Sequence, residues 1–209
     1  MRSAPSCCGL KLQQSAKLSL GMSDLRVLVV GISGAGKTTF ARRLAAAAGV
    51  DFLDLDVVNW RPGWVDRSTT ETSAFIADIE AAAQRPHWAI SGSYHSKVGE
   101  RLWRRATHAV WLDLPRLSVM AQVVPRSLQR AWGGKDVFPG CRETWPRLIT
   151  KEHPIRWAWD NHARRRATLE AVSADPAFAH VHVLRCRSRR EADAAMAALI
   201  AQARGLNMR

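Results

Sequence analysis

The chain has 209 residues, 47% of them apolar, which is enough for one α/β domain with a buried core. Four cysteines without zinc-ligand spacing exclude a disulfide scaffold and a zinc module, and no run approaches the roughly 20 apolar residues that span a membrane. The formal net charge of +13 favours a polyanionic ligand, either a nucleotide or a nucleic acid, although drift in an Ala- and Arg-rich chain explains the excess equally well. We expect a cytoplasmic protein.

The first 22 residues differ from the rest of the chain. They contain three basic residues, no acidic residue and no continuous apolar segment, so they do not resemble a signal peptide. We expect residues 1–22 to be a disordered extension, or the product of a start codon assigned too far upstream, because Met22 directly precedes the first periodic segment. Residues 23–205 are expected to form a single domain.

A phosphate-binding loop follows the first predicted strand, Leu25–Val30. The segment Gly31-Ile-Ser-Gly-Ala-Gly-Lys-Thr38 matches G-x-x-x-x-G-K-[ST] at every fixed position, and a helix is predicted over Thr38–Ala48. Glycines permit a tight loop whose backbone N–H groups point inward, and the helix N-terminus faces the same anion. We predict that Lys37 reaches the β- and γ-phosphates of ATP or GTP and that the Thr38 hydroxyl binds Mg²⁺. The predicted nucleotide-binding residues are Gly31, Ser33, Gly34, Ala35, Gly36, Lys37, Thr38 and Thr39.

Carboxylates end the second predicted strand, Val50–Leu55. Asp54 and Asp56 share one face by the period of two, and ligands of doubly wound sheets bind beyond the carboxyl ends of strands. We predict Asp56, the nearer to that end, as a catalytic residue and magnesium ligand, and Asp54 as the second choice and a substrate-binding residue. A solvated strand end is the alternative interpretation.

The segment after this strand carries the predicted acceptor site. Asn59–Trp64 is a Pro-Gly loop in which Trp60 and Trp64 could stack on a base or sugar of the second substrate; packing in the core or lid is the alternative. Ser68-Thr-Thr-Glu71 matches a capping box, which predicts a helix to about Gln84.

Two more strands are predicted at His87–Ser91 and His108–Leu112, with a short helix near 98–105 between them. Asp113 follows the fourth strand in the manner of a Walker B carboxylate, but it is a weaker candidate that could instead cap the next helix.

Arginines mark a predicted lid at about residues 120–150. A helix is predicted over Arg116–Trp132, although Pro125 must kink or interrupt it, and a mobile Gly/Pro-rich loop follows over 133–146. Arg126 and Arg130 fall four residues apart on one helical face, so we predict that they act in catalysis by neutralising the transferring phosphoryl group. Arg142 and the run 164–166 are further candidates, and a solvated basic face is the alternative.

A helix at about 157–172, a fifth strand at 181–184 and a last helix at 189–203 complete the chain. Strands alternating with helices predict a three-layer α/β/α domain with a five-stranded parallel sheet.

Residues 25–199 resemble the adenylate-kinase-related P-loop proteins named DNA topology modulation proteins. Besides the P-loop, the resemblance rests on Leu55-Asp56 followed by Trp60-Arg-Pro-Gly-Trp64, on Trp88-Ala-Ile-Ser-Gly-Ser-Tyr94, on Trp111-Leu-Asp-Leu-Pro115, and on Arg126 and Arg130. It implies a P-loop NTPase fold of the nucleotide-kinase type with a helical lid, ATP as nucleotide, and Tyr94 as a further substrate-binding residue. Ser91 stands where family members usually carry Asp, which raises the weight on Asp56 and Thr38 as magnesium ligands.

Two functions follow from these patterns. The first is transfer of the γ-phosphoryl group of ATP to a small acceptor such as a nucleoside monophosphate. The alternative is a nucleotide-dependent nucleic-acid-binding or DNA-topology-modulating protein, motivated by the charge, of which residues 1–21 supply +3 and leave +10 for the domain. Arginines that converge on the cleft would favour the enzyme, and arginines spread over one outer face would favour nucleic acid.

Overall fold

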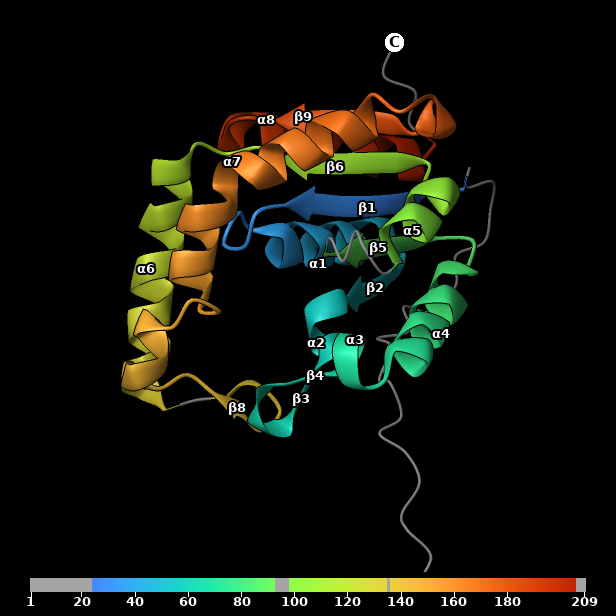
Figure 1. Ribbon diagram of the computed structural model, residues 1–209. Helices are drawn as coiled ribbons and strands as arrows, with labels where there is room; N and C mark the ends of the chain where they lie inside the picture. The colour runs from blue at the N-terminus through green and yellow to red at the C-terminus, as the bar shows by residue number, and fades with distance from the viewer. Residues whose placement is uncertain (1–23, 93–97, 135, 206–209) are drawn as a thin grey trace, which may run out of the picture.

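The computed structural model describes residues 24–92, 98–134 and 136–205, so the expectations for residues 1–22 and for Tyr94 lie outside the described residues. Five parallel strands form the central sheet in the order β2-β5-β1-β6-β9 (Figure 1). The strands are β1 (Arg26–Gly31), β2 (Asp51–Asp54), β5 (Trp88–Ser91), β6 (His108–Leu112) and β9 (His182–Cys186). The predicted five-stranded parallel sheet is confirmed.

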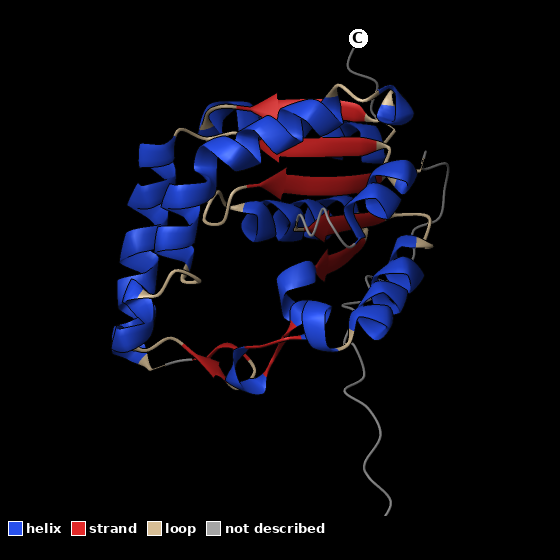
Figure 2. Ribbon diagram, in the orientation of Figure 1, coloured by secondary structure: helices blue, strands red, loops and turns tan. Residues whose placement is uncertain are grey.

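Helices cover both faces of this sheet (Figure 2). One apolar cluster joins Val27 and Val29 of β1 to α1 (Lys37–Ala48) and α8 (Arg189–Ala203). The alternate residues Leu28 and Val30 face a second cluster with three other helices. These are α4 (Thr72–Ala83), α5 (Glu100–Arg105) and α7 (Pro154–Ser173). A strand buried on both faces explains the continuous apolar run of β1.

The second strand ends one residue earlier than predicted. The carboxylate of Asp54 accepts a hydrogen bond from the Asp56 N–H at 3.1 Å and so caps a short helix, α2 (Leu55–Asn59). The predicted loop then contains an antiparallel hairpin, β3 (Trp60–Arg61) and β4 (Val65–Asp66), around a 3₁₀ turn at Pro62–Trp64.

The capping box predicted at Ser68 is wrong. Helix α3 (Arg67–Thr70) begins one residue before Ser68, whose N–H donates to Asn59 Oδ1 at 2.8 Å. Glu71 instead accepts from the Arg67 guanidinium at 2.9 Å, so a buried arginine outcompetes the backbone for this carboxylate. The same S-x-x-E pattern at Ser188 does cap a helix, because Ser188 Oγ accepts from the Glu191 N–H at the start of α8.

Helix α6 (Arg116–Gly133) continues through Pro125 without the interruption that the sequence suggested as one outcome. Pro125 cannot donate to the carbonyl of Ala121, but both residues are exposed, so water can satisfy that oxygen. The loop expected over 133–146 contains a second antiparallel hairpin, β7 (Asp136–Phe138) and β8 (Cys141–Arg142), followed by a 3₁₀ helix at Trp145–Ile149. The sequence analysis did not predict the secondary structure of this segment.

Residues 116–173, from α6 through α7, form what we call the arm. Its two helices pack side by side at one end of the sheet, and β8 lies next to β3 (Figure 1). The Gly63 N–H donates to the Gly140 carbonyl at 2.9 Å, and Trp64 Nε1 donates to the Arg142 carbonyl at 2.8 Å. The two hairpins are therefore joined by hydrogen bonds. Within the described residues, no helix has the length and apolar character needed to cross a membrane.

Candidate active site

The P-loop lies between β1 and α1 in a conformation that requires its glycines. Gly31, Gly34 and Gly36 have φ angles of 147°, 85° and 94°. A Cβ on Gly31 would lie 2.7 Å from the carbonyl oxygen of Leu112 in the neighbouring strand, so a side chain is excluded there. The loop and the N-terminus of α1 together form the anion site that the sequence predicts.

Lys37, the first residue of α1, turns back over this loop. Its Nζ donates to the Ile32 carbonyl at 3.0 Å. Burial lowers the pKa of Lys37, and the carboxylates of Asp56 and Asp54 act in the opposite direction. A cation enclosed beside two carboxylates and a ring of amides is arranged to receive a polyphosphate.

Sheet register brings Asp54 to Thr38. Asp54 is the register partner of Ser91 on β5, and the Ser91 hydroxyl lies 3.3 Å from Thr38 Oγ1. Burial and the neighbouring Asp56 raise the pKa of Asp54 to about 6, while hydrogen bonds with Thr38 and the Asp56 N–H oppose the rise. The structure thus places Asp54, the second choice of the sequence analysis, closest to the predicted metal-binding hydroxyl.

Asp56 lies two residues farther on, in α2, and is only half-buried. Its field raises the pKa of Lys37 and that of Arg126 on α6. The two aspartates therefore have different neighbours: Asp54 hydrogen-bonds with Thr38, and the charge of Asp56 acts on the P-loop lysine and on Arg126 of the arm.

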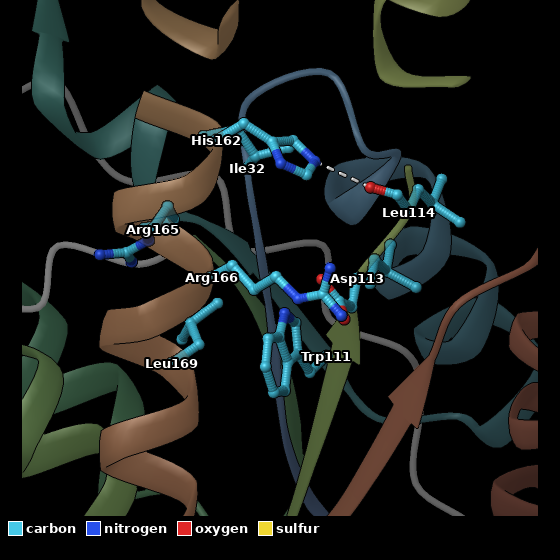
Figure 3. Close-up of a pocket in the computed structure, with 9 residues that line it drawn as sticks. Ile32, Trp111, Asp113, Leu114, His162, Arg165, Arg166 and Leu169 are labelled. Atoms are coloured by element: carbon cyan, nitrogen blue, oxygen red, sulfur yellow. Dashed lines mark hydrogen bonds and ion pairs between the residues drawn. The ribbon is translucent and has the colours of Figure 1, made fainter. Parts of the chain in front are cut away.

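The third carboxylate, Asp113, is occupied elsewhere. Its buried side chain pairs with Arg185 at 2.7 Å. It also pairs at 3.3 Å with Arg166 of α7, which lies beside it in Figure 3. It does not cap α6, whose N-cap residue is Pro115 without a side-chain hydrogen bond. His162 Nε2, 2.9 Å from the Leu114 carbonyl, makes a second attachment of α7 to this end of the sheet.

Two arginines of the arm face the P-loop. Arg126 on α6 and Arg165 on α7 both lower the pKa of Lys37 by their charge. Their own pKa values are lowered by burial first, and then by Arg130 and Arg164 respectively. Figure 3 shows Arg165 and Arg166 leaving α7 on different sides, so the pairing of Arg166 with Asp113 fixes the direction of its neighbour.

Arg130, the other predicted lid arginine, lies one turn beyond Arg126. Its guanidinium is 4.0 Å from the buried carboxylate of Glu143, which follows β8. The arginines predicted from the helical spacing are therefore on the same side of α6 and share a counter-charge.

The two tryptophans of the predicted acceptor site lie in the β3–β4 hairpin. The Arg147 guanidinium stacks 3.8 Å from the centre of the Trp64 ring, and Trp60 and Phe138 meet Trp64 edge-on at 5.5 and 6.0 Å. Trp64 is thus engaged with the arm, whereas Trp60 meets Trp64 edge-on and is half-buried.

A groove of about 490 Å³ lies beyond the carboxyl end of β9. It separates the start of α6 from the start of α8, and its lining is Leu114, Pro115, Ser118, Ala121, Gln122, Arg187, Ser188 and Arg189. Its volume lies within the range of small-molecule sites.

Sequence reasoning missed this groove and Glu143, and it named Arg165 only within a run of three arginines. The groove joins residues about 70 positions apart, so no local pattern indicates it. The i, i+4 spacing shows which arginines of a helix share a face, but it does not show how one helix is oriented against another.

A family model described as AAA domain matches residues 27–122. Shikimate kinase of Rhodopseudomonas palustris (strain ATCC BAA-98 / CGA009) is 38% identical over 52 residues, which are 25% of this chain and 26% of that protein. The match therefore spans about a quarter of this curated relative.

Among solved structures, shikimate kinase from Acinetobacter baumannii in complex with shikimate covers 90% of this chain and 97% of its own, with a TM-score of 0.51 and 15% identity. A gluconokinase from Sinorhizobium meliloti 1021 covers 90% and 99%, with a TM-score of 0.44 and 15% identity. Sheet order, P-loop and this structural likeness agree: the chain has the P-loop NTPase fold that is also found in shikimate kinase.

Proposed function

We propose that this protein is an ATP-dependent phosphotransferase that moves the γ-phosphoryl group to a hydroxyl or phosphate of a small acceptor. One observation carries the proposal: a lysine, two carboxylates and two arginines gather at one site. The lysine belongs to the P-loop, the carboxylates to β2 and α2, and the arginines to the arm, and their charges shift the pKa of the lysine. Phosphoryl transfer needs mainly positioning and charge neutralisation, and this set supplies both.

The P-loop amides and Lys37 hold the β- and γ-phosphates in this proposal. The groove beyond β9 receives the base, because it opens next to Leu114 and Pro115 at the same edge of the sheet. Its lining includes the polar side chains of Ser118 and Gln122, which suit adenine better than a purely apolar slot would.

Thr38 and Asp54 fit a magnesium ion. Mg²⁺ prefers oxygen ligands and is usually bound by one or two carboxylates together with substrate phosphates and water. Asp54 is buried and carries a raised pKa, so a nearby cation would stabilise its ionised form. When bound, the ion neutralises charge on the phosphates. The sequence favoured Asp56 for this role, and the contact with Thr38 supports Asp54 instead.

We assign Asp56 to the acceptor. A carboxylate facing Lys37 and Arg126 can accept the proton of an acceptor hydroxyl or orient it toward the phosphorus atom. Arg126 and Arg165 stabilise the charge on the transferring group, with the arm acting as the lid. Trp60 remains the proposed stacking residue of the acceptor site, and Trp64 joins the arm to it.

A panel of acceptors tests the proposal. The purified protein is incubated with MgATP and, separately, with nucleoside monophosphates, shikimate, gluconate and simple polyols, and ADP release is followed. At least one acceptor is expected to raise ADP release well above the rate with water alone. The absence of any acceptor-dependent release across the panel, from protein that binds MgATP, would contradict a kinase function.

A nucleotide-dependent nucleic-acid-binding role is the second candidate, supported by the net charge of +13. The effect of Arg126 and Arg165 on the pKa of Lys37 favours the enzyme, because it indicates that these two charges lie near the P-loop and not on an outer face. Titration of labelled single- and double-stranded DNA at low salt separates the two. Tight binding with a steep salt dependence would support the nucleic-acid role.

A cytoplasmic location is part of the proposal. Cys141 and Cys186, the two cysteines within the described residues, are buried free thiols, which fits a reducing compartment.

A further inference from the structure

A buried carboxylate–imidazole pair lies inside the arm, outside the phosphate site. The Glu143 side chain is 2% exposed and that of His153 is 0% exposed. His153 Nδ1 accepts the Ile155 N–H at 3.2 Å, at the start of α7. Because Nδ1 is an acceptor, the neutral ring carries its proton on Nε2, which donates to Glu143 Oε1. The tautomer of the histidine thus directs an N–H donor at Glu143 Oε1 and fixes the orientation of the carboxyl group.

The second oxygen of this carboxylate faces arginines. Glu143 Oε2 lies 4.0 Å from Arg130, and the charge of Glu143 raises the pKa values of Arg126 and Arg147 against the effect of their burial. Arg126 and Arg130 lie on one helical face and repel each other, which lowers the pKa of Arg126. Glu143 is the counter-charge that this face of α6 needs.

Three buried groups in this network have no hydrogen-bond partner among the described residues: Glu143 Oε2, Arg126 Nε and Arg147 Nε. Buried donors of native proteins are normally paired, so the guanidinium N–H of Arg126 is a donor that a bound ligand can satisfy. The charge of Arg126 acts on Lys37, so a phosphoryl oxygen held by Lys37 is a suitable acceptor.

Glu143 is also tied to the acceptor side. It follows β8 directly, where Cys141 Sγ donates to the Arg61 carbonyl and the Arg142 carbonyl accepts from Trp64 Nε1. The contact between the two hairpins therefore sets the backbone position from which Glu143 reaches the arginines.

From this geometry we propose that Glu143, oriented by His153, is a positioning residue that presents Arg126 and Arg130 to the transferring phosphoryl group when the two hairpins are joined. The inference rests on the proposed phosphotransferase function. Glu143 acts through the arginines and does not touch the nucleotide, so its loss should weaken binding of the transition state and leave ground-state binding of the nucleotide intact.

The test compares Glu143→Gln with the matched control Glu152→Gln, an exposed glutamate of the same arm. Calorimetry measures the affinities for MgADP and for MgADP with fluoroaluminate, which mimics the planar phosphoryl group. The wild type and E152Q should bind the mimic more tightly than MgADP. E143Q should bind MgADP within about twofold of the wild type and lose about tenfold or more of the mimic's affinity. Unchanged affinity for the mimic, or equal loss for both ligands, would overturn the proposal.

A chain already carrying Arg126→Gln and Arg130→Gln gives a second readout, because Glu143 then has no arginine to present. Adding E143Q to this double variant should leave its affinity for the mimic unchanged, and a further tenfold loss would refute the inference. This comparison also decides the question if E143Q alone does not fold. Failure of the proposed function looks different: the wild type would bind no MgADP, or would bind the mimic no better than MgADP.

Discussion

The nucleotide end and the arm end of this site are built in different ways. The nucleotide end is one continuous segment, Gly31–Thr38, whose conformation follows from three glycines and a helix start. The arm end combines Arg126, Glu143 and Arg165, whose positions depend on how two helices and two hairpins pack. Consequently, a change at the first end should remove nucleotide binding, and a change at the second should remove chemistry while nucleotide still binds.

The largest effect is expected from Lys37→Ala. The side chain neutralises phosphate charge in an enclosed site, so its loss should reduce turnover by about a thousandfold and abolish measurable MgATP binding. Acceptor-dependent ADP release and calorimetry measure the two quantities. Lys151→Ala, an exposed lysine of the arm, is the control and should behave as the wild type. Unaltered MgATP affinity in K37A would refute the assignment of the P-loop.

The double change Arg126→Gln and Arg130→Gln tests the other end. Both guanidinium groups act in the transition state, so kcat should fall by about a hundredfold while the affinity for MgATP changes by less than about threefold. Steady-state kinetics gives this split. The paired substitution Arg101→Gln and Arg104→Gln on α5, where both arginines form exposed ion pairs, should change neither value. Parallel losses of affinity and turnover would mean that the arm has no separate role.

These two ends also differ in how far the sequence predicts them. The P-loop and the five strands were predicted because their determinants are local: glycine spacing, apolar runs and flanking turns. The pattern S-x-x-E predicted a capping box at Ser68 that the structure does not form, since the buried Arg67 takes the glutamate, whereas the same pattern at Ser188, which the sequence analysis did not use, does cap a helix. Both hairpins were missed because their short strands of two or three residues carry no periodicity.

The difference between local and tertiary determinants also explains which site residues the sequence could identify. Asp54 and Asp56 were recognised as a pair, but only the register of β2 against β5 brings Asp54 to Thr38. Arg165 could not be separated from its neighbours, because the salt bridge between Arg166 and Asp113 that fixes the rotation of α7 joins positions 53 residues apart. Tertiary contacts, which no single segment encodes, decide these roles.

The free energy of unfolding should depend on pH through Asp54, at the nucleotide end of the site. The pKa of Asp54 is raised from 3.8 to about 6, so the folded state binds this proton more tightly than the unfolded chain does. Stability from this group is therefore lost as the pH rises from about 4 through 6. In EDTA at pH 7.5, Asp54→Asn should raise the free energy of unfolding by on the order of 1–3 kcal/mol, and the gain should vanish near pH 4.

Denaturant titrations at the two pH values measure this difference. Asp193→Asn, at an exposed carboxylate, is the control without a pH-dependent gain. The same D54N chain should lose the magnesium dependence of ATP binding. Asp54 would then be a residue that lowers the stability of the ligand-free protein but is needed for binding MgATP. A gain that is as large at pH 4 as at pH 7.5 would exclude Asp54 as its source.

The smallest effect is expected at the contact between the hairpins. Trp64→Ala removes the stacking of Arg147 and the hydrogen bond to Arg142, interactions of about 1–2 kcal/mol. The value of kcat/KM for the acceptor should fall about three- to tenfold, with MgATP affinity unchanged. Trp132→Ala serves as the control, because that side chain is 84% exposed on the arm. An equal kcat/KM in the two variants would show that the contact between the hairpins does not contribute to catalysis.

Phosphorus NMR of the reaction tests the central claim most directly, because it shows where the phosphoryl group goes. With wild-type protein, MgATP and an acceptor that stimulates ADP release, the γ-phosphate signal of ATP should be replaced by ADP and by a new phosphorylated acceptor, in equal amounts. ADP accompanied only by inorganic phosphate, or an unchanged ATP spectrum, would contradict the assignment of this fold and site to phosphoryl transfer.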